Sequence, residues 1–122
     1  MNSPVWYHGA NGDNIIQIIR EGKMRPNNGQ IFYSSSGYSG CFAMGADLKR
    51  RACYVIQVRC QIPNDVRVEN RSTNVPGTKV VLTSSPITVE VLELYIRAAK
   101  ATTVSIVKGR SAIEKYFSTL SH

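Results

Sequence analysis

Runs of apolar positions, broken by turn residues, divide the chain into short strands. The clearest pattern is residues 52–61, ACYVIQVRCQ, where β-branched and aromatic residues dominate and Ile62-Pro63 ends the run. Other strands are predicted at residues 5–7, 30–34, 65–69, 79–82 and 87–96. Residues 103–107 fit either another strand or the lead-in to a helix. Most of the predicted regular structure is therefore extended.

Two segments carry helical spacing instead. Isoleucines recur at i, i+3 and i+4 within residues 14–21, with Asp13 as the predicted N-cap and Gly22 as the stop. Residues 111–120 have a second amphipathic pattern, which predicts a helix docked on the sheet. A short helix is also expected within residues 41–48. The order of strand, helix, several strands and terminal helix indicates an α+β fold.

Composition and charge limit the class of protein. A chain of 122 residues with 43% hydrophobic and 19% charged residues suits one globular domain, residues 1–122. No apolar run is long enough for a membrane helix, and the first residues lack a secretory pattern, so no membrane partner is expected. The net charge of +7 favours phosphate-bearing partners or simply solubility. The densest basic run, Lys49-Arg50-Arg51, fits phosphate contacts or an ordinary charged helix end.

The cysteines give no sign of a metal site. The chain has three cysteines, Cys41, Cys53 and Cys60, which cannot all form disulfides with one another. Their spacing contains no C-x-x-C motif. We expect buried, reduced thiols and no metal, which favours a reducing compartment.

The candidate chemistry lies where two predicted strands end. Tyr7-His8-Gly9 ends the first, and Phe32-Tyr33 ends the second, with Tyr38 and Phe42 just beyond. A glycine beside His8 lets flat ligand atoms approach the backbone, and aromatic rings can hold a planar ligand. Without a family comparison, a histidine such as His8 is more often an ordinary surface or capped residue, and aromatic residues such as Tyr33 and Phe42 more often belong to a core.

The order of these features resembles a known superfamily. The run Tyr7-His8-Gly9 is followed by NIIQIIREG at residues 14–22 and then by Phe32-Tyr33-Ser34. This succession, continued by the later strands, is similar to the diphtheria-toxin and poly(ADP-ribose) polymerase branch of the ADP-ribosyltransferase superfamily. The similarity covers most of residues 4–97. It implies a split antiparallel β-sheet with flanking helices and a cleft that binds NAD in a bent shape.

The resemblance also implies roles for single residues. His8 would hydrogen-bond the adenine-side ribose, and Gly9 would offer its backbone N–H and C=O to the nicotinamide carboxamide. Tyr33 would stack on the nicotinamide ring, with Phe42 or Tyr38 on its second face. The implied reaction cleaves the bond between nicotinamide and ribose through an oxocarbenium-like transition state.

The chain departs from the family at its third element, a glutamate at the start of a strand. Lys79 falls where that glutamate is expected, and an ammonium repels the positive charge that a carboxylate would stabilise. Glu90 and Glu93, on the next strand, are the nearest alternatives. Strand alternation predicts that at most one of them faces the cleft, and Glu90 is the candidate catalytic carboxylate.

Three functions remain open. The first is NAD-dependent transfer of one ADP-ribose unit to a protein or nucleic-acid acceptor, with release of nicotinamide. The second is a module of the same fold that binds NAD, ADP-ribose or nucleic acid and does little chemistry. The third is an RNA 2′-phosphotransferase-like activity, because those enzymes share the fold, lack the glutamate, and have a segment that residues 71–83 resemble. A cytoplasmic or nuclear location is expected for an endogenous protein, and secretion or delivery into a host cell for a toxin.

Overall fold

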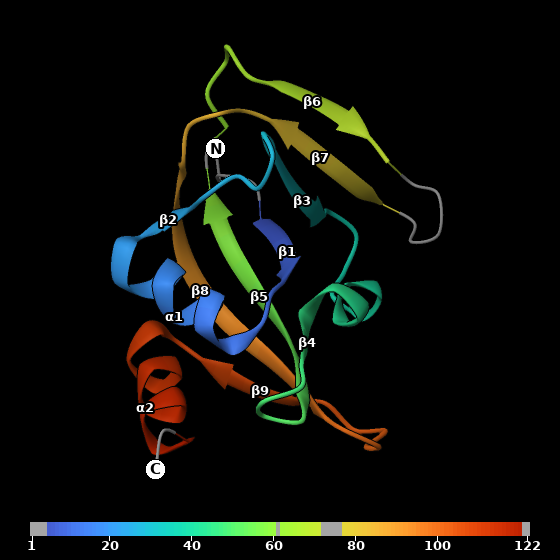
Figure 1. The fold of residues 1–122 in the computed structure, drawn as a ribbon, viewed down its shortest axis with the longest axis vertical. Coiled ribbons are helices and arrows are strands. Elements are labelled where there is room, and N and C mark those ends of the chain that lie inside the picture. Colours follow the sequence, from blue (N-terminus) through green and yellow to red (C-terminus); the bar gives the residue numbers. More distant parts are fainter. Residues whose placement is uncertain (1–4, 61, 72–76, 121–122) are drawn as a thin grey trace.

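The structure, a computed structural model, describes residues 5–60, 62–71 and 77–120, which form a mostly antiparallel sheet with helices (Figure 1). The strands run in the order β2-β8-β5-β1-β3-β7-β6, with β4 paired to β5 and β9 to β8. Their bounds are β1 Val5–Gly9, β2 Lys23–Met24, β3 Gln30–Ser34, β4 Ala46–Asp47, β5 Ala52–Cys60, β6 Arg67–Asn70, β7 Thr78–Leu82, β8 Ile87–Ala98 and β9 Ser105–Lys108. The α+β interpretation is confirmed at this level, and the segment left open near residue 105 is strand β9.

Helix α1, Gly12–Glu21, follows β1 directly. Its N-cap is Asn11, whose side-chain oxygen accepts a hydrogen bond from Asn14 N at 2.9 Å. The prediction of Asp13 as the cap is therefore wrong, because that carboxylate binds Arg50 instead. Gly22 ends the helix as predicted, in the left-handed conformation with φ 67° that glycine adopts without strain.

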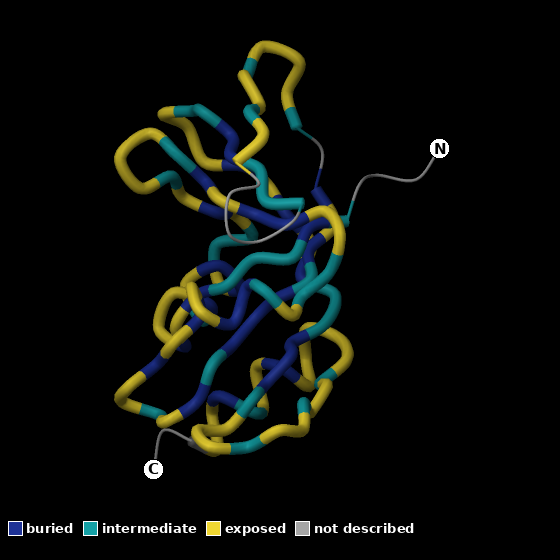
Figure 2. The backbone as a smooth tube through the Cα atoms, turned by 90° about the vertical axis from the view of Figure 1, so that its right-hand side faces the viewer, coloured by how far each residue is buried: buried dark blue, intermediate teal, exposed yellow. Residues whose placement is uncertain are grey.

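Helix α2, Arg110–Leu120, packs beside α1 on one face of the sheet (Figure 1). Its Ile113 and Phe117 are buried against the main hydrophobic core, where Tyr54 and Leu94 are also fully enclosed. In Figure 2 the buried stretches run through the centre of the sheet, whereas the chain reversals at its ends are exposed. The core thus fixes β1, β5 and β8 as the rigid floor from which the site is built.

A second, smaller cluster covers the opposite face. The segment predicted as a short helix at residues 41–48 is a 3-10 helix, η1, at Ser39–Gly45, followed by β4. Phe42 of η1 packs there with Val55 and Tyr95. The segment is too short and too rich in glycine for an α-helix.

The sheet opens between two of its central strands. Only one registered pair, Tyr7 with Ser34, joins β1 to β3 within the described residues, whereas β1 pairs with β5 along its whole length. Beyond that pair β3 leaves with β7 and β6 as a separate arm. This divergence creates the space for the site.

A bulge in β8 changes which way its glutamates face. The register with β5 shifts between Gln57 and Val58, so that Gln57 is opposite Glu93 and Arg59 is opposite Glu90. Gln57 and Arg59 are two residues apart and share a face, and cross-strand partners share it as well. Glu90 and Glu93 therefore lie on the same face, and the prediction of opposite faces is wrong because regular alternation does not survive a bulge.

The cysteines and the helices bear on two further expectations. All three thiols are free, with Cys41 and Cys60 buried and Cys53 half-buried, and burial raises the pKa of both Cys41 and Cys60. None of the described helices combines the length and the apolar character that crossing a bilayer requires.

Candidate functional site

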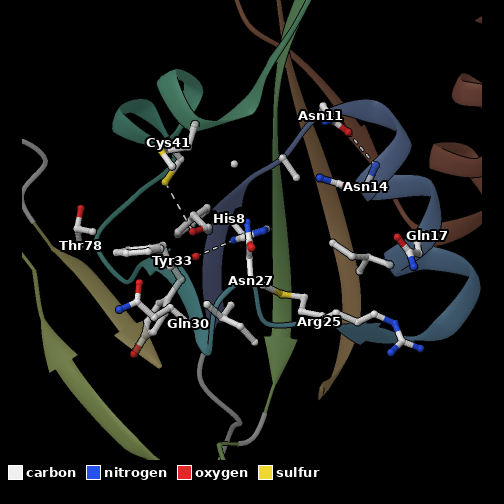
Figure 3. A pocket seen from close by; sticks show the side chains of 18 of the residues that line it. His8, Asn11, Asn14, Gln17, Arg25, Asn27, Gln30, Tyr33, Cys41 and Thr78 are labelled. Carbon is white, nitrogen blue, oxygen red and sulfur yellow. Dashed lines mark hydrogen bonds between the residues drawn. The ribbon is translucent and has the colours of Figure 1, made fainter. Parts of the chain in front are cut away.

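A pocket of about 620 Å³ lies where β1 and β3 diverge, with α1 as one wall and η1 as another (Figure 3). A volume of this size suits a drug- or cofactor-sized ligand. His8, Gly9 and Tyr33 all line it. The structure therefore brings Tyr33 of β3 together with His8 and Gly9 of β1, which lie in a separate segment of the sequence.

His8 is held by the strand opposite. Its Nδ1 lies 2.6 Å from the carbonyl oxygen of Phe32, and because a carbonyl only accepts, Nδ1 carries the proton. Burial lowers the pKa of His8 below its ordinary value of 6.5, and the bond to Phe32 opposes this only in part. At neutral pH the imidazole is uncharged, and its Nε2 is a hydrogen-bond acceptor.

Tyr33 is covered on one face by another aromatic ring. The ring centroids of Trp6 and Tyr33 are 3.7 Å apart and their planes differ by 6°. Burial also raises the pKa of Tyr33, so the phenol is protonated at neutral pH. Because Trp6 occupies one face, a ligand can stack only on the other.

Gly9 is required by a close approach of η1. A Cβ built at this position would collide with the carbonyl oxygen of Cys41 and lie 3.0 Å from Gly45 N. The direction of the Gly9 backbone follows from the hydrogen bonds of its neighbour. Ala10 N donates to Tyr54 O on β5, and successive N–H groups of a strand point to opposite edges. The Gly9 N–H and C=O therefore point toward the edge from which β3 has diverged.

The other two predicted aromatic residues are not among those that line the pocket. Tyr38 stacks on Tyr95 with ring centroids 4.2 Å apart, and Phe42 is buried beneath the guanidinium of Arg97 at 4.8 Å. Both belong to the cluster on the opposite face of the sheet. The structure places Trp6 beside Tyr33 instead, a partner that the sequence analysis missed because the two residues are far apart in the chain.

The predicted carboxylate does not reach the pocket either. Glu90 is exposed and pairs with Arg59 at 3.2 Å. Tyr7 and Glu93 are both cross-strand partners of Gln57, so their side chains share one face of the sheet. The His8 ring is on the other face, and both glutamates therefore lie on the side of the sheet away from it. Among the described lining residues the one carboxylate is Glu21, which is bound to Arg25 at 2.7 Å, a contact that lowers the pKa of Glu21.

On β7, Thr78 lines the pocket and Lys79 does not. Lys79 is opposite Tyr33 in the ladder, and Thr78 is opposite Ser34. The expectation of an ammonium in the cleft was therefore one residue off. A hydroxyl at this position accepts and donates hydrogen bonds without repelling positive charge.

The remaining polar wall is rich in carboxamides, which the sequence analysis did not single out. Asn14 and Gln17 face the pocket from α1. Asn11, Asn27 and Gln30 also line it. The spacing of Asn14, Gln17 and Glu21 at i, i+3 and i+7 was a usable signal, but it equally describes a solvated helix face.

A buried carboxylate fixes the start of α1. Asp47 Oδ2 accepts from Gly12 N at 2.8 Å and from Arg50 Nη1 at 3.0 Å, and Arg50 also reaches Asp13 at 2.9 Å. Burial alone would raise the pKa of Asp47, but the hydrogen bonds from Gly12 and Arg50 together lower it. This network sets the position of the helical wall.

The chain is thus an α+β protein with a ligand-sized pocket at the divergence of two central strands. The described residues contain no group of histidine, cysteine and acidic side chains arranged to hold a metal ion. Comparisons with protein-family models, curated proteins and solved structures gave no significant match.

Proposed function

We propose that the pocket binds NAD and that the protein transfers a single ADP-ribose unit to a protein or nucleic-acid acceptor, releasing nicotinamide. One observation carries the proposal: His8, Gly9 and Tyr33, which the resemblance assigns to NAD, line one pocket of suitable size. The sheet that opens between β1 and β3 is in keeping with the ADP-ribosyltransferase-like split sheet proposed for the fold.

Each residue suits its proposed role chemically. Neutral His8 presents Nε2 as an acceptor for a ribose hydroxyl. Gly9 directs a donor and an acceptor of the backbone toward the opened edge, which matches the C=O and NH₂ of a carboxamide. Tyr33, supported by Trp6, offers one ring face for stacking on nicotinamide.

The absence of an unpaired carboxylate among the described lining residues favours a second candidate. Glu21 is bound to Arg25. On β7 the pocket is lined by the uncharged Thr78, at the place where a carboxylate would stabilise positive charge on the ribose. The second candidate is a protein that binds NAD or ADP-ribose in the same way and cleaves it slowly or not at all.

One experiment separates the two. The protein is incubated with NAD, and nicotinamide release is measured by chromatography alongside thermal unfolding. A transferase releases nicotinamide, and the release falls in His8→Ala and Tyr33→Ala but not in the control Lys115→Ala, at an exposed position that does not line the pocket. A binding module gains roughly 2.7 kcal/mol of stability at a hundredfold excess of NAD over Kd, with no release.

The proposal is overturned if NAD causes neither release of nicotinamide nor thermal stabilisation of the protein. The RNA 2′-phosphotransferase alternative has one observation in its favour: Arg71, which also pairs with Glu69 at 2.8 Å, lines the pocket and can attract a phosphate. It predicts NAD consumption only when 2′-phosphorylated RNA is added, which a further arm of the same assay measures.

A further inference from the structure

Two chain reversals lie side by side at one end of the sheet. The first joins β4 to β5, and the second joins β8 to β9. Ala52 pairs with Ala98, and Ala99 N donates to Arg51 O at 2.9 Å, which holds the reversals together. Four basic residues, here named the basic turn surface, lie on these reversals or beside them: Lys49, Arg51 and Lys100 on the reversals, and Arg97 at the adjoining end of β8.

The positive charge of this surface is not neutralised by the described residues. None of its four cations forms an ion pair with a described acidic side chain, whereas Arg50, in the same run, holds both Asp13 and Asp47. Lys49, Arg51 and Lys100 are exposed. The surface therefore keeps its full charge toward solvent.

Two of the cations stand on strained backbone. Arg51 has φ 52° and Lys100 has φ 66°, the left-handed region that residues other than glycine rarely adopt. Glycine or asparagine would relieve this strain. Such outliers, kept together in space and both basic, point to a role for the side chains.

Arg97 adds a preset flat group. Its guanidinium lies 4.8 Å from the centre of the Phe42 ring, and the ring itself is buried. The Phe42 ring therefore holds the guanidinium in place, and Arg97 remains half-exposed to solvent. Unpaired nucleic-acid bases stack on arginine planes.

We propose that the basic turn surface binds single-stranded nucleic acid, with phosphates on Lys49, Arg51 and Lys100 and a base stacked on Arg97. Spaced cations on adjoining turns match the regular charges of a polyanion better than a single anion. An anionic membrane fits less well, because Leu48 is the one large exposed apolar side chain described on these two reversals. The proposal needs no NAD and does not rest on the proposed function.

The test uses fluorescence anisotropy with a labelled oligonucleotide of roughly 16 nucleotides and mixed sequence, between about 50 and 200 mM salt. We expect Lys49→Gln/Arg51→Gln/Lys100→Gln to bind at least ~10-fold more weakly and to lower the salt slope by about 2, since each phosphate contact contributes roughly 0.7. The matched control, Arg20→Gln/Lys108→Gln/Lys115→Gln, removes equal charge from exposed positions elsewhere and keeps most of the affinity. Equal weakening of both variants overturns the site.

Arg97→Lys tests the stacking. It keeps the charge and removes the plane, so affinity falls about 10-fold while the salt slope stays the same. A duplex of the same sequence binds more weakly than the single strand. Equal binding of duplex and single strand overturns the single-strand assignment. Binding to phosphatidylserine vesicles without binding to the oligonucleotide overturns the proposal in favour of a membrane. Circular dichroism and thermal unfolding verify that each variant is folded.

Discussion

Trp6 covers one face of the Tyr33 ring, with ring centroids 3.7 Å apart and planes 6° from parallel. The two residues come from β1 and β3, whose backbones share a single registered pair among the described residues. The stacked rings therefore help to join strands that the backbone ladder holds weakly. They also leave at most one face of the Tyr33 ring to line the pocket, because Tyr33 is otherwise buried in the core.

Replacing Trp6 by alanine should lower the free energy of unfolding by about 3–5 kcal/mol, because a large, fully enclosed side chain leaves a cavity. Trp6→Phe retains a stacked ring and should lose much less. Chemical denaturation measures both changes. NAD-dependent stabilisation should fall more in Trp6→Ala than in Trp6→Phe, and equal losses would argue against a supporting role for the ring.

Gly9→Ala should destabilise the fold by roughly 1–3 kcal/mol, since the added methyl group meets the backbone of Cys41 and Gly45 rather than a flexible side chain. Thermal or denaturant unfolding gives the value. Wild-type stability in this variant would contradict the close approach of η1. Any loss of NAD binding in Gly9→Ala is interpreted together with the loss of stability measured for the same variant.

Protonation of His8 should weaken NAD binding only on the acid side of its ordinary pKa of 6.5. Burial lowers the folded-state pKa, so the ring stays neutral from neutral pH down to 6.5 and becomes charged below it, when Nε2 changes from acceptor to donor. The unfolded chain takes up the proton first, so stability also falls as pH drops below 6.5. Binding and unfolding measured against pH check this, and His8→Asn should remove its contribution to both profiles.

Asp47→Asn should cost roughly 1.5–3 kcal/mol, because a buried, charge-assisted set of hydrogen bonds is weakened. The folded-state pKa of Asp47 lies below its ordinary 3.8, so its contribution is complete above pH 3.8 and is lost as pH falls through the folded-state value. The variant should lose that part of the acid sensitivity. Denaturant unfolding compares it with the control Asp65→Asn, at an exposed position, which should change little.

Local patterns predicted the long elements well. Residues 52–61 and the isoleucine spacing of residues 14–21 correspond to β5 and α1, because burial on one face imposes the period that the sequence displays. The two-residue strands β2 and β4 were missed, since so short a segment has no period. Their extended backbone comes from pairing with β8 and β5, which lie far along the chain.

Part of the candidate site could also be predicted from local patterns. His8, Gly9 and Tyr33 stand at strand ends that local patterns reveal, and all three line the pocket. Long-range packing decides the rest: Trp6 sits on Tyr33, and the bulge in β8 sends Glu90 to the same face as Glu93. No local pattern in the sequence signals a bulge one residue long.

Among the described residues one backbone pair joins β1 to β3, and two side-chain contacts add to it: the imidazole of His8 on the Phe32 carbonyl and the stacked rings of Trp6 and Tyr33. Side chains therefore hold the arm formed by β3, β7 and β6 against β1 where the backbone ladder does not, because Ile31, Tyr33 and Val81 of that arm are buried in the main core. The imidazole of His8 thus lines the pocket and also ties together the two strands that border it. A substitution of His8 therefore alters the lining of the pocket and the joint between β1 and β3 at the same time.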